Sequence, residues 1–179
     1  MSSIPATEQK LAEARYHLAL LLGAAKDVTA QRHHLSALLA AGRSVTFVLQ
    51  SEAKAEYDAW FSSWSGALTP TDQRLMAFMN EQRVAEVHRV GAAVSTTVEE
   101  RSVWRRKSAG SNTPMVAQRL ALGLHGEEAF GLYGEENVKI GVPTLMFEVD
   151  GGQKPARDVC ARYVRLLEAL VADFKRAFA

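Results

Sequence analysis

Arg83 and His88 are the residues of this sequence whose types and spacing most suggest chemistry. The planar guanidinium of an arginine binds phosphate oxygens through paired hydrogen bonds, and an imidazole exchanges protons near neutral pH. Side chains five residues apart on a helix point about 140° apart, so convergence within one chain relies on the reach of the arginine. Arg119 and His125 form a second pair of this kind, in a glycine-containing region. The alternative for Arg83 and His88 is ordinary ion pairing with nearby carboxylates.

A basic and aromatic cluster is the second candidate site. Trp104 is followed directly by Arg105, Arg106 and Lys107. In single-stranded RNA the phosphates bind cationic side chains and the bases stack on aromatic rings. We therefore predict RNA binding by this cluster. Two glutamates just upstream reduce the local positive charge, so a solvated loop or strand edge is the alternative.

No metal site and no cofactor are expected. The sequence has no Cys-x-x-Cys or His-Glu-x-x-His pattern. His17, His33 and His34 lie on adjacent predicted helices and could meet, but one ring of a histidine doublet usually faces water while the other packs at a helix edge. Cys160 lies on an apolar stripe, which predicts a buried, inert thiol rather than a nucleophile.

An aromatic segment at helical spacing contains Tyr57, Trp60, Phe61 and Trp64. Rings at this spacing share one side of a helix and more often fill a core than bind a ligand. Binding of a small ligand among the tryptophans stays open as an alternative.

Composition describes an ordinary globular protein rather than a nucleic-acid-coating or membrane protein. Apolar residues make up 47% of the 179 residues and the net charge is +1, which excludes a global electrostatic attraction to nucleic acid. The longest apolar stretch, residues 18–25, is far shorter than the roughly 20 residues that span a bilayer. With one cysteine and no recognisable leader, we expect a cytoplasmic protein without membrane contact.

Hydrophobic periodicity predicts a mainly α fold, an up-and-down bundle of four to five helices. The predicted helices cover residues 6–26, 28–50, 51–64, 71–90 and 155–178. Pro5 is expected to start the first helix, and Thr69 or Thr71 to cap the fourth. The expected apolar faces contain Leu35, Leu38, Leu39, Gly42, Val45 and Leu49 on the second helix, Leu75, Phe78, Met79, Val87 and Val90 on the fourth, and Cys160, Tyr163, Leu167, Leu170, Phe174 and Phe178 on the last. A small antiparallel β element is expected within residues 91–152, with strand candidates at 94–98, 120–124 and 140–149 and a turn at 150–152. We therefore predict a single domain, residues 1–179, in which 91–152 is a β and loop insertion before the C-terminal helix. Gly42 is expected to allow a close helix approach.

The chain resembles the HEPN superfamily of compact helical bundles. The resemblance covers roughly residues 10–90 and 155–178, through the runs RHHLSALLAAGRSVTFVLQ, EYDAWFSSW and MNEQRVAEVH. Ribonuclease members of that superfamily carry an arginine followed by four to six residues and a histidine on a late helix. Arg83 and His88 match that motif.

The resemblance implies metal-independent RNA cleavage at a homodimer cleft, in which the 2′-hydroxyl attacks the adjacent phosphate. Arg83 would stabilise charge on the phosphoryl oxygens and His88 would act as general acid or base. A homodimer, an RNA substrate and a cognate protein partner are the expected partners. The alternative is a non-catalytic helical module that dimerises or binds a partner protein.

Overall fold

The computed structural model describes residues 3–24, 26–88, 91–106 and 135–179. Side chains are not described at 88, 101, 103–106 and 135–138. The elements in chain order are α1 (Pro5–Gly23), α2 (Val28–Glu52), α3 (Lys54–Ala67), α4 (Pro70–His88), β1 (Val94–Arg106), β2 (Glu135–Val149), β3 (Gly152–Pro155) and α6 (Ala156–Ala177). The chain divides into two compact units, one made of Met1–Thr97 with Pro143–Ala179 and the other of Val98–Val142.

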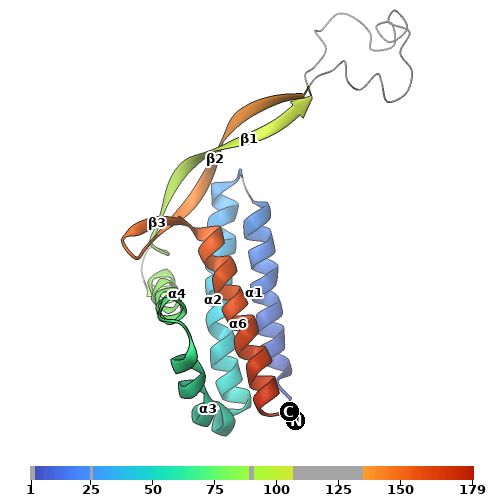
Figure 1. Ribbon diagram of the computed structural model, residues 1–179, viewed down its shortest axis with the longest axis vertical. Helices are drawn as coiled ribbons and strands as arrows, with labels where there is room; N and C mark the ends of the chain where they lie inside the picture. Colours follow the sequence, from blue (N-terminus) through green and yellow to red (C-terminus); the bar gives the residue numbers. More distant parts are fainter. Residues whose placement is uncertain (1–2, 25, 89–90, 107–134) are drawn as a thin grey trace, which may run out of the picture. The chain divides into compact units, whose positions relative to one another are not determined.

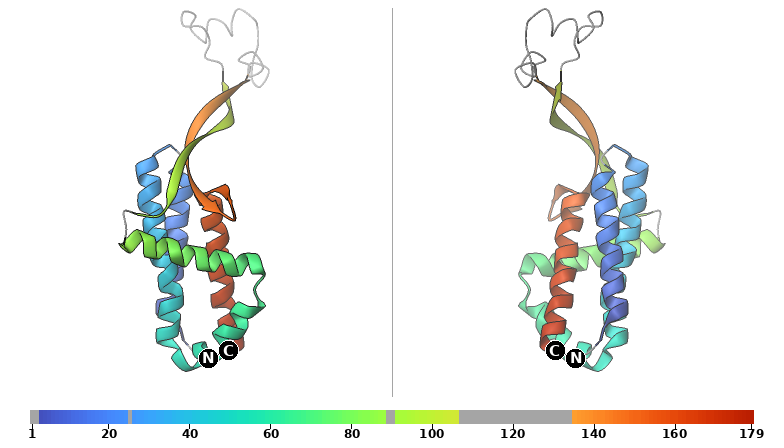
Figure 2. Two further views of the ribbon diagram at one scale, coloured as in Figure 1. Left: turned by 90° about the vertical axis from the view of Figure 1, so that its left-hand side faces the viewer. Right: turned by 90° about the vertical axis from the view of Figure 1, so that its right-hand side faces the viewer.

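The helical unit is built on three long helices. α1, α2 and α6 lie side by side along one axis, and the short α3 lies at the end where α6 finishes (Figure 1). α4 runs across α2 and α6 rather than along them (Figure 2). Five helices in the described ranges, with a three-stranded sheet before the last, confirm the predicted fold class.

The core faces of α2 and α6 are the ones that the sequence predicts. On α2 the buried stripe contains Leu35, Leu38, Leu39, Gly42, Val45 and Leu49. On α6 it contains Cys160, Tyr163, Leu167, Leu170 and Phe174. Three- and four-residue spacing keeps such positions on one side of a helix, so the apolar residues of each helix meet those of the other helices in one core.

α4 is the helix whose buried face the sequence predicts incorrectly. Leu75, Phe78 and Met79 pack in or against the core as expected, but Val87 is 51% exposed. The buried position in this part of the helix is Gln82. Its side-chain oxygen accepts a hydrogen bond from the Ala93 backbone N–H at 2.9 Å, which satisfies the polar group inside the fold.

The start of α1 is capped by a residue from another helix. Pro5 occupies the first turn as expected, but no side chain near Ile4 caps the helix. Instead the Glu52 carboxylate accepts hydrogen bonds from the N–H groups of Ala6 at 2.9 Å and Thr7 at 2.8 Å, and from the Thr7 hydroxyl at 2.7 Å. Burial acts to raise the pKa of Glu52, but these hydrogen bonds outweigh it and the pKa is lowered. A negative charge is thereby held at a helix N-terminus.

The sheet has the strand order β1-β2-β3. β2 pairs antiparallel with β3 from Met146 opposite Pro155 to Val149 opposite Gly152. Asp150 and Gly151 form the connection with φ of 53° and 74°, as the predicted turn requires. The strand candidate at 120–124 lies outside the described residues.

In the Val98–Val142 unit, β1 and β2 face each other at close range. A Cβ added to Gly141 would lie 2.8 Å from Cγ1 of Val98, so a glycine is needed opposite this valine. Lys139 Nζ contacts Glu100 Oε2 at 3.2 Å across the same two strands. This exposed ion pair contributes little to stability.

Candidate functional site

Arg83 lies on α4 with its side chain half-buried. In the part of the chain that the structure describes, its guanidinium has no hydrogen bond or ion pair. Two carboxylates that could neutralise it are engaged elsewhere, because Glu86 accepts a hydrogen bond from the Ala92 N–H and Asp58 pairs with Lys54. His88 ends α4, and its side chain lies outside the described residues. The ion-pairing alternative is therefore not observed for Arg83.

An exposed apolar pair lies between these two residues on α4. Val84 and Val87 are each 51% exposed and share one side of the helix at three-residue spacing. The pair Val84 and Val87 and the pair Arg83 and His88 are both centred midway between residues 85 and 86 of the helix. Arg83 and His88 therefore flank a small apolar stripe that faces away from the core.

Several contacts fix α4 in position at both of its ends. The Thr69 hydroxyl accepts from the Asp72 N–H at 3.2 Å, which confirms Thr69 as one of the two expected caps. Asp72 in turn pairs with Arg162 of α6 at 2.7 Å. At the other end Gln82 accepts from the Ala93 backbone N–H. α4 is thus a rigid platform for Arg83.

The structure does not describe the side chains of the predicted RNA-binding residues. Trp104, Arg105 and Arg106 belong to β1, but their side chains lie outside the described part of the structure, and Lys107 lies outside it entirely. The alternative pair Arg119 and His125 also lies outside the described residues. RNA binding by the basic cluster stays a prediction.

Cys160 is buried, and His33 and His34 differ in exposure, as the sequence predicts. Cys160 is fully buried, and burial raises the pKa of its thiol, so it stays a protonated, inert group. His33 is exposed, whereas His34 is half-buried with its ring 6.2 Å from that of His17. Among the described residues no group of three or more histidine, cysteine or acidic side chains could hold a metal ion.

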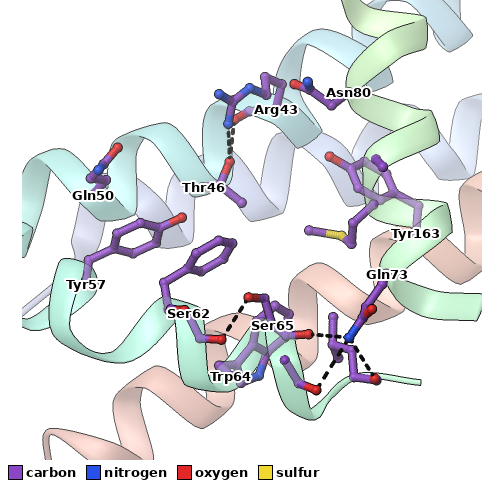
Figure 3. Close-up of a pocket in the computed structure, with 15 residues that line it drawn as sticks. Arg43, Thr46, Gln50, Tyr57, Ser62, Trp64, Ser65, Gln73, Asn80 and Tyr163 are labelled. Carbon is purple, nitrogen blue, oxygen red and sulfur yellow. Dashed lines mark hydrogen bonds between the residues drawn. The ribbon is translucent and has the colours of Figure 1, made fainter. Parts of the chain in front are cut away.

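A cleft of about 810 Å³ opens between α2, α3, α4 and α6. Its polar lining includes Arg43, Thr46 and Gln50 from α2, Gln73 and Asn80 from α4, and Tyr57 and Tyr163 (Figure 3). Phe61, Trp64, Leu68 and Met76 supply an apolar wall. A volume of this size lies within the range of small-ligand sites.

The predicted aromatic segment contributes to the core and also lines the cleft. Trp60 packs edge-on against Phe174 with ring centroids 5.3 Å apart, which is a core contact. Tyr57, Phe61 and Trp64 belong partly to the core, but they also line the cleft, where the Tyr57 and Phe61 rings stack at 4.7 Å. The core interpretation is confirmed, and the cleft keeps the ligand alternative open.

Sequence reasoning missed Arg43 and Tyr163. A usable signal exists on α2, where Arg43, Thr46 and Gln50 follow helical spacing and form a polar stripe beside the apolar face. No comparable signal marks Tyr163, because it lies on the apolar stripe of α6 and reaches the cleft only through the packing of α6 against α2.

Gly42 shapes this cleft, as expected for a close helix approach. A Cβ added at Gly42 would lie 2.5 Å from Cε1 of the buried Tyr163 ring. We expect Gly42→Ala to destabilise the protein by about 1–2 kcal/mol, because the cost of forcing the ring aside exceeds the gain in helix propensity. Urea unfolding followed by circular dichroism measures this. Gly23→Ala, which meets nothing within 4 Å, is the control and should not lose stability. A Gly42→Ala protein as stable as wild type would contradict the packing.

No helix in the described ranges combines the length and apolarity that crossing a membrane requires. Comparison with family models, curated proteins and solved structures finds no match to this chain.

Proposed function

We propose that this protein is a homodimeric, metal-independent endoribonuclease whose active site is formed by Arg83 and His88. The observation that carries the proposal is the exposed stripe of Val84 and Val87, which is centred on the same point of α4 as Arg83 and His88. The HEPN resemblance supplies the reaction class, and the unpaired state of Arg83 among the described residues supports its availability to a phosphate.

A two-fold axis through the midpoint of this stripe explains how the pair would converge. Packing Val84 of one copy against Val87 of the other, with the two α4 helices antiparallel, places Arg83 of each copy level with His88 of its partner. The two residues are then separated across the interface instead of along one helix. They still lie on opposite sides of the valine stripe, so the reach of the arginine has to bring its guanidinium to the imidazole. The valines supply the apolar contact that such an interface needs.

The chemistry is transfer of the phosphate within the RNA chain. The 2′-hydroxyl loses its proton to a base and attacks the adjacent phosphorus. The bond from phosphorus to the 5′-oxygen breaks as that oxygen gains a proton, which gives a 2′,3′-cyclic phosphate and a 5′-hydroxyl end. His88 acts in proton transfer, and the Arg83 guanidinium stabilises the charge that develops on the phosphoryl oxygens.

Incubation of purified protein with labelled single-stranded RNA in EDTA tests the proposal. We expect fragments that end in 2′,3′-cyclic phosphate, and we expect RNA with 2′-O-methyl groups to resist. Absence of cleavage would remove the enzyme and leave the non-catalytic dimerisation or partner-binding module. An Arg119→Ala, His125→Ala variant should cleave normally, and its failure would move the site to that pair.

The basic cluster provides the substrate contact in this proposal. We expect Arg105→Ala with Arg106→Ala to weaken RNA binding, and to lower the slope of log affinity against log salt by about 1–2, because each arginine releases counterions on binding a phosphate. Filter binding over a salt series measures this. Lys26→Ala with Arg32→Ala, which removes two exposed cations elsewhere, is the charge-matched control. Equal losses in both variants would show a general charge effect only.

A cytoplasmic location and a cognate protein partner complete the proposal. The buried, protonated Cys160 thiol, with no second cysteine to pair with, is compatible with a reducing compartment. The same Val84 and Val87 stripe would be covered in the homodimer, so a regulatory partner that blocks it would also block cleavage.

A further inference from the structure

The cleft between α2, α3, α4 and α6 carries a charge that the proposed ribonuclease does not use. Arg43 is the cation among its fifteen lining residues, and none of the fifteen is acidic. In the described part of the chain Arg43 forms no ion pair. Its only side-chain hydrogen bond there is to the Thr46 hydroxyl, at 2.7 Å from Nη1, which anchors one side of the guanidinium and leaves donors on the other.

Two tyrosine hydroxyls add donors to the same cleft. Neither the Tyr57 nor the Tyr163 hydroxyl has a hydrogen-bond partner among the described residues, although both rings are buried. Burial raises the pKa of Tyr57 to about 12, against the Arg43 charge, which lowers it, and with the Asp58 charge, which also raises it. Burial likewise raises the pKa of Tyr163, against the opposing effect of Arg43. Both hydroxyls therefore stay protonated and able to donate near neutral pH.

The aromatic side of the cleft is held in place by contacts within the protein. Phe61 stacks between Tyr57 and Trp64, with ring centroids 4.7 and 5.9 Å away. Trp64 Nε1 donates to Asp173 at 3.1 Å, which fixes the indole. Gln73 Nε2 is within 3.1–3.4 Å of the carbonyls of Ser65, Gly66 and Leu68, so it braces the link between α3 and α4. A wall fixed before binding costs little ordering entropy.

We propose that this cleft binds a small anion that carries a planar aromatic ring and one carboxylate or phosphate group. The ring lies against the aromatic wall, and the anionic group is held by the free donors of Arg43 and by the tyrosine hydroxyls. An acid-free lining favours an anion over a cation, and the single guanidinium matches one anionic group. The site is separate from Arg83, so it binds its ligand whether or not the protein cleaves RNA.

Calorimetric titration of the full chain in low salt, without RNA, tests the site with matched probes. Indole-3-acetate carries a carboxylate on an aromatic ring system, and 5′-AMP carries a phosphate on an aromatic nucleoside. Indole and adenosine are the corresponding compounds without the anionic group. We expect at least one anion to bind, and its uncharged counterpart to bind about tenfold more weakly or not at all. The better anion identifies the anionic group.

Substitutions at Arg43 connect that binding to the cleft. We expect Arg43→Gln to weaken binding about 10- to 100-fold, because a charge-assisted paired contact is lost, and Arg43→Lys to lose less. Tyr163→Phe should weaken binding several-fold through its hydroxyl alone. Arg32→Gln, an exposed arginine elsewhere on α2, is the control and should bind normally. The proposal is overturned if neither anion binds at about 1 mM, or if Arg43→Gln binds as tightly as Arg32→Gln.

Discussion

Arg83→Ala and His88→Ala are each expected to lower RNA cleavage by about 10²–10³-fold, since each removes a group that acts on the transition state. The reason is local: Arg83 has no structural partner among the described residues, so its loss should leave the fold intact. Cleavage rates under single-turnover conditions measure the effect, and circular dichroism checks the fold. Cleavage that survives both substitutions would exclude this pair.

A heterodimer of the two inactive chains gives the sharper result. If each site combines Arg83 of one copy with His88 of the other, a dimer of one Arg83→Ala chain and one His88→Ala chain keeps one intact site of two. Co-expression with two different tags and tandem purification isolates this dimer, which should recover about half of the wild-type rate. A site within one chain predicts no recovery, because each chain then lacks one member of its own pair.

Val84→Asp with Val87→Asp should abolish both the dimer and the cleavage, with a loss comparable to that of the active-site variants. Four carboxylates would meet across the two-fold axis in place of an apolar contact, and like charges at an interface are strongly unfavourable. Both valines are half-exposed, so the isolated chain should still fold. Analytical ultracentrifugation and the RNA assay, run on the same sample, measure the two effects together.

Phe47→Asp is the matched control for this pair. Phe47 is 65% exposed on α2 and lies outside the Val84 stripe, so its substitution should change neither the dimer nor the rate. A dimer that is broken by Phe47→Asp and unaffected by the valine substitutions would place the interface on α2. A monomeric wild-type protein would remove the composite site.

The buried faces show where sequence patterns succeed and where they stop. The stripes of α2 and α6 are correct because each is a run of large apolar residues at unbroken helical spacing, so only one face can be buried. On α4 the same reasoning places Val87 in the core. The structure buries Gln82 instead, because the backbone N–H of Ala93, just before β1, donates a hydrogen bond that satisfies this polar side chain inside the fold.

Some candidate site residues can likewise be recognised from the sequence, and others only from the structure. Arg83 and the aromatic segment are recognisable from residue type and spacing alone, because their spacing is local. The spacing of Arg43, Thr46 and Gln50 marks a polar stripe on α2, but it does not show that this stripe lines a cleft. That depends on Tyr57 and Tyr163, which α3 and α6 bring to Arg43.

By itself the sequence determined the mainly helical bundle, the bounds of its helices to within a few residues, and the buried, inert state of Cys160. These properties follow from periodicity, which depends on neighbours three and four residues away. Only the tertiary structure decided that α4 crosses the bundle with Val84 and Val87 exposed, that Glu52 caps the start of α1, and that an acid-free cleft forms around Arg43. These features depend on contacts between positions that are distant in the sequence, such as Thr7 with Glu52, 45 positions apart, and Asp72 with Arg162, 90 positions apart. A pattern of neighbouring residues contains no information about such contacts.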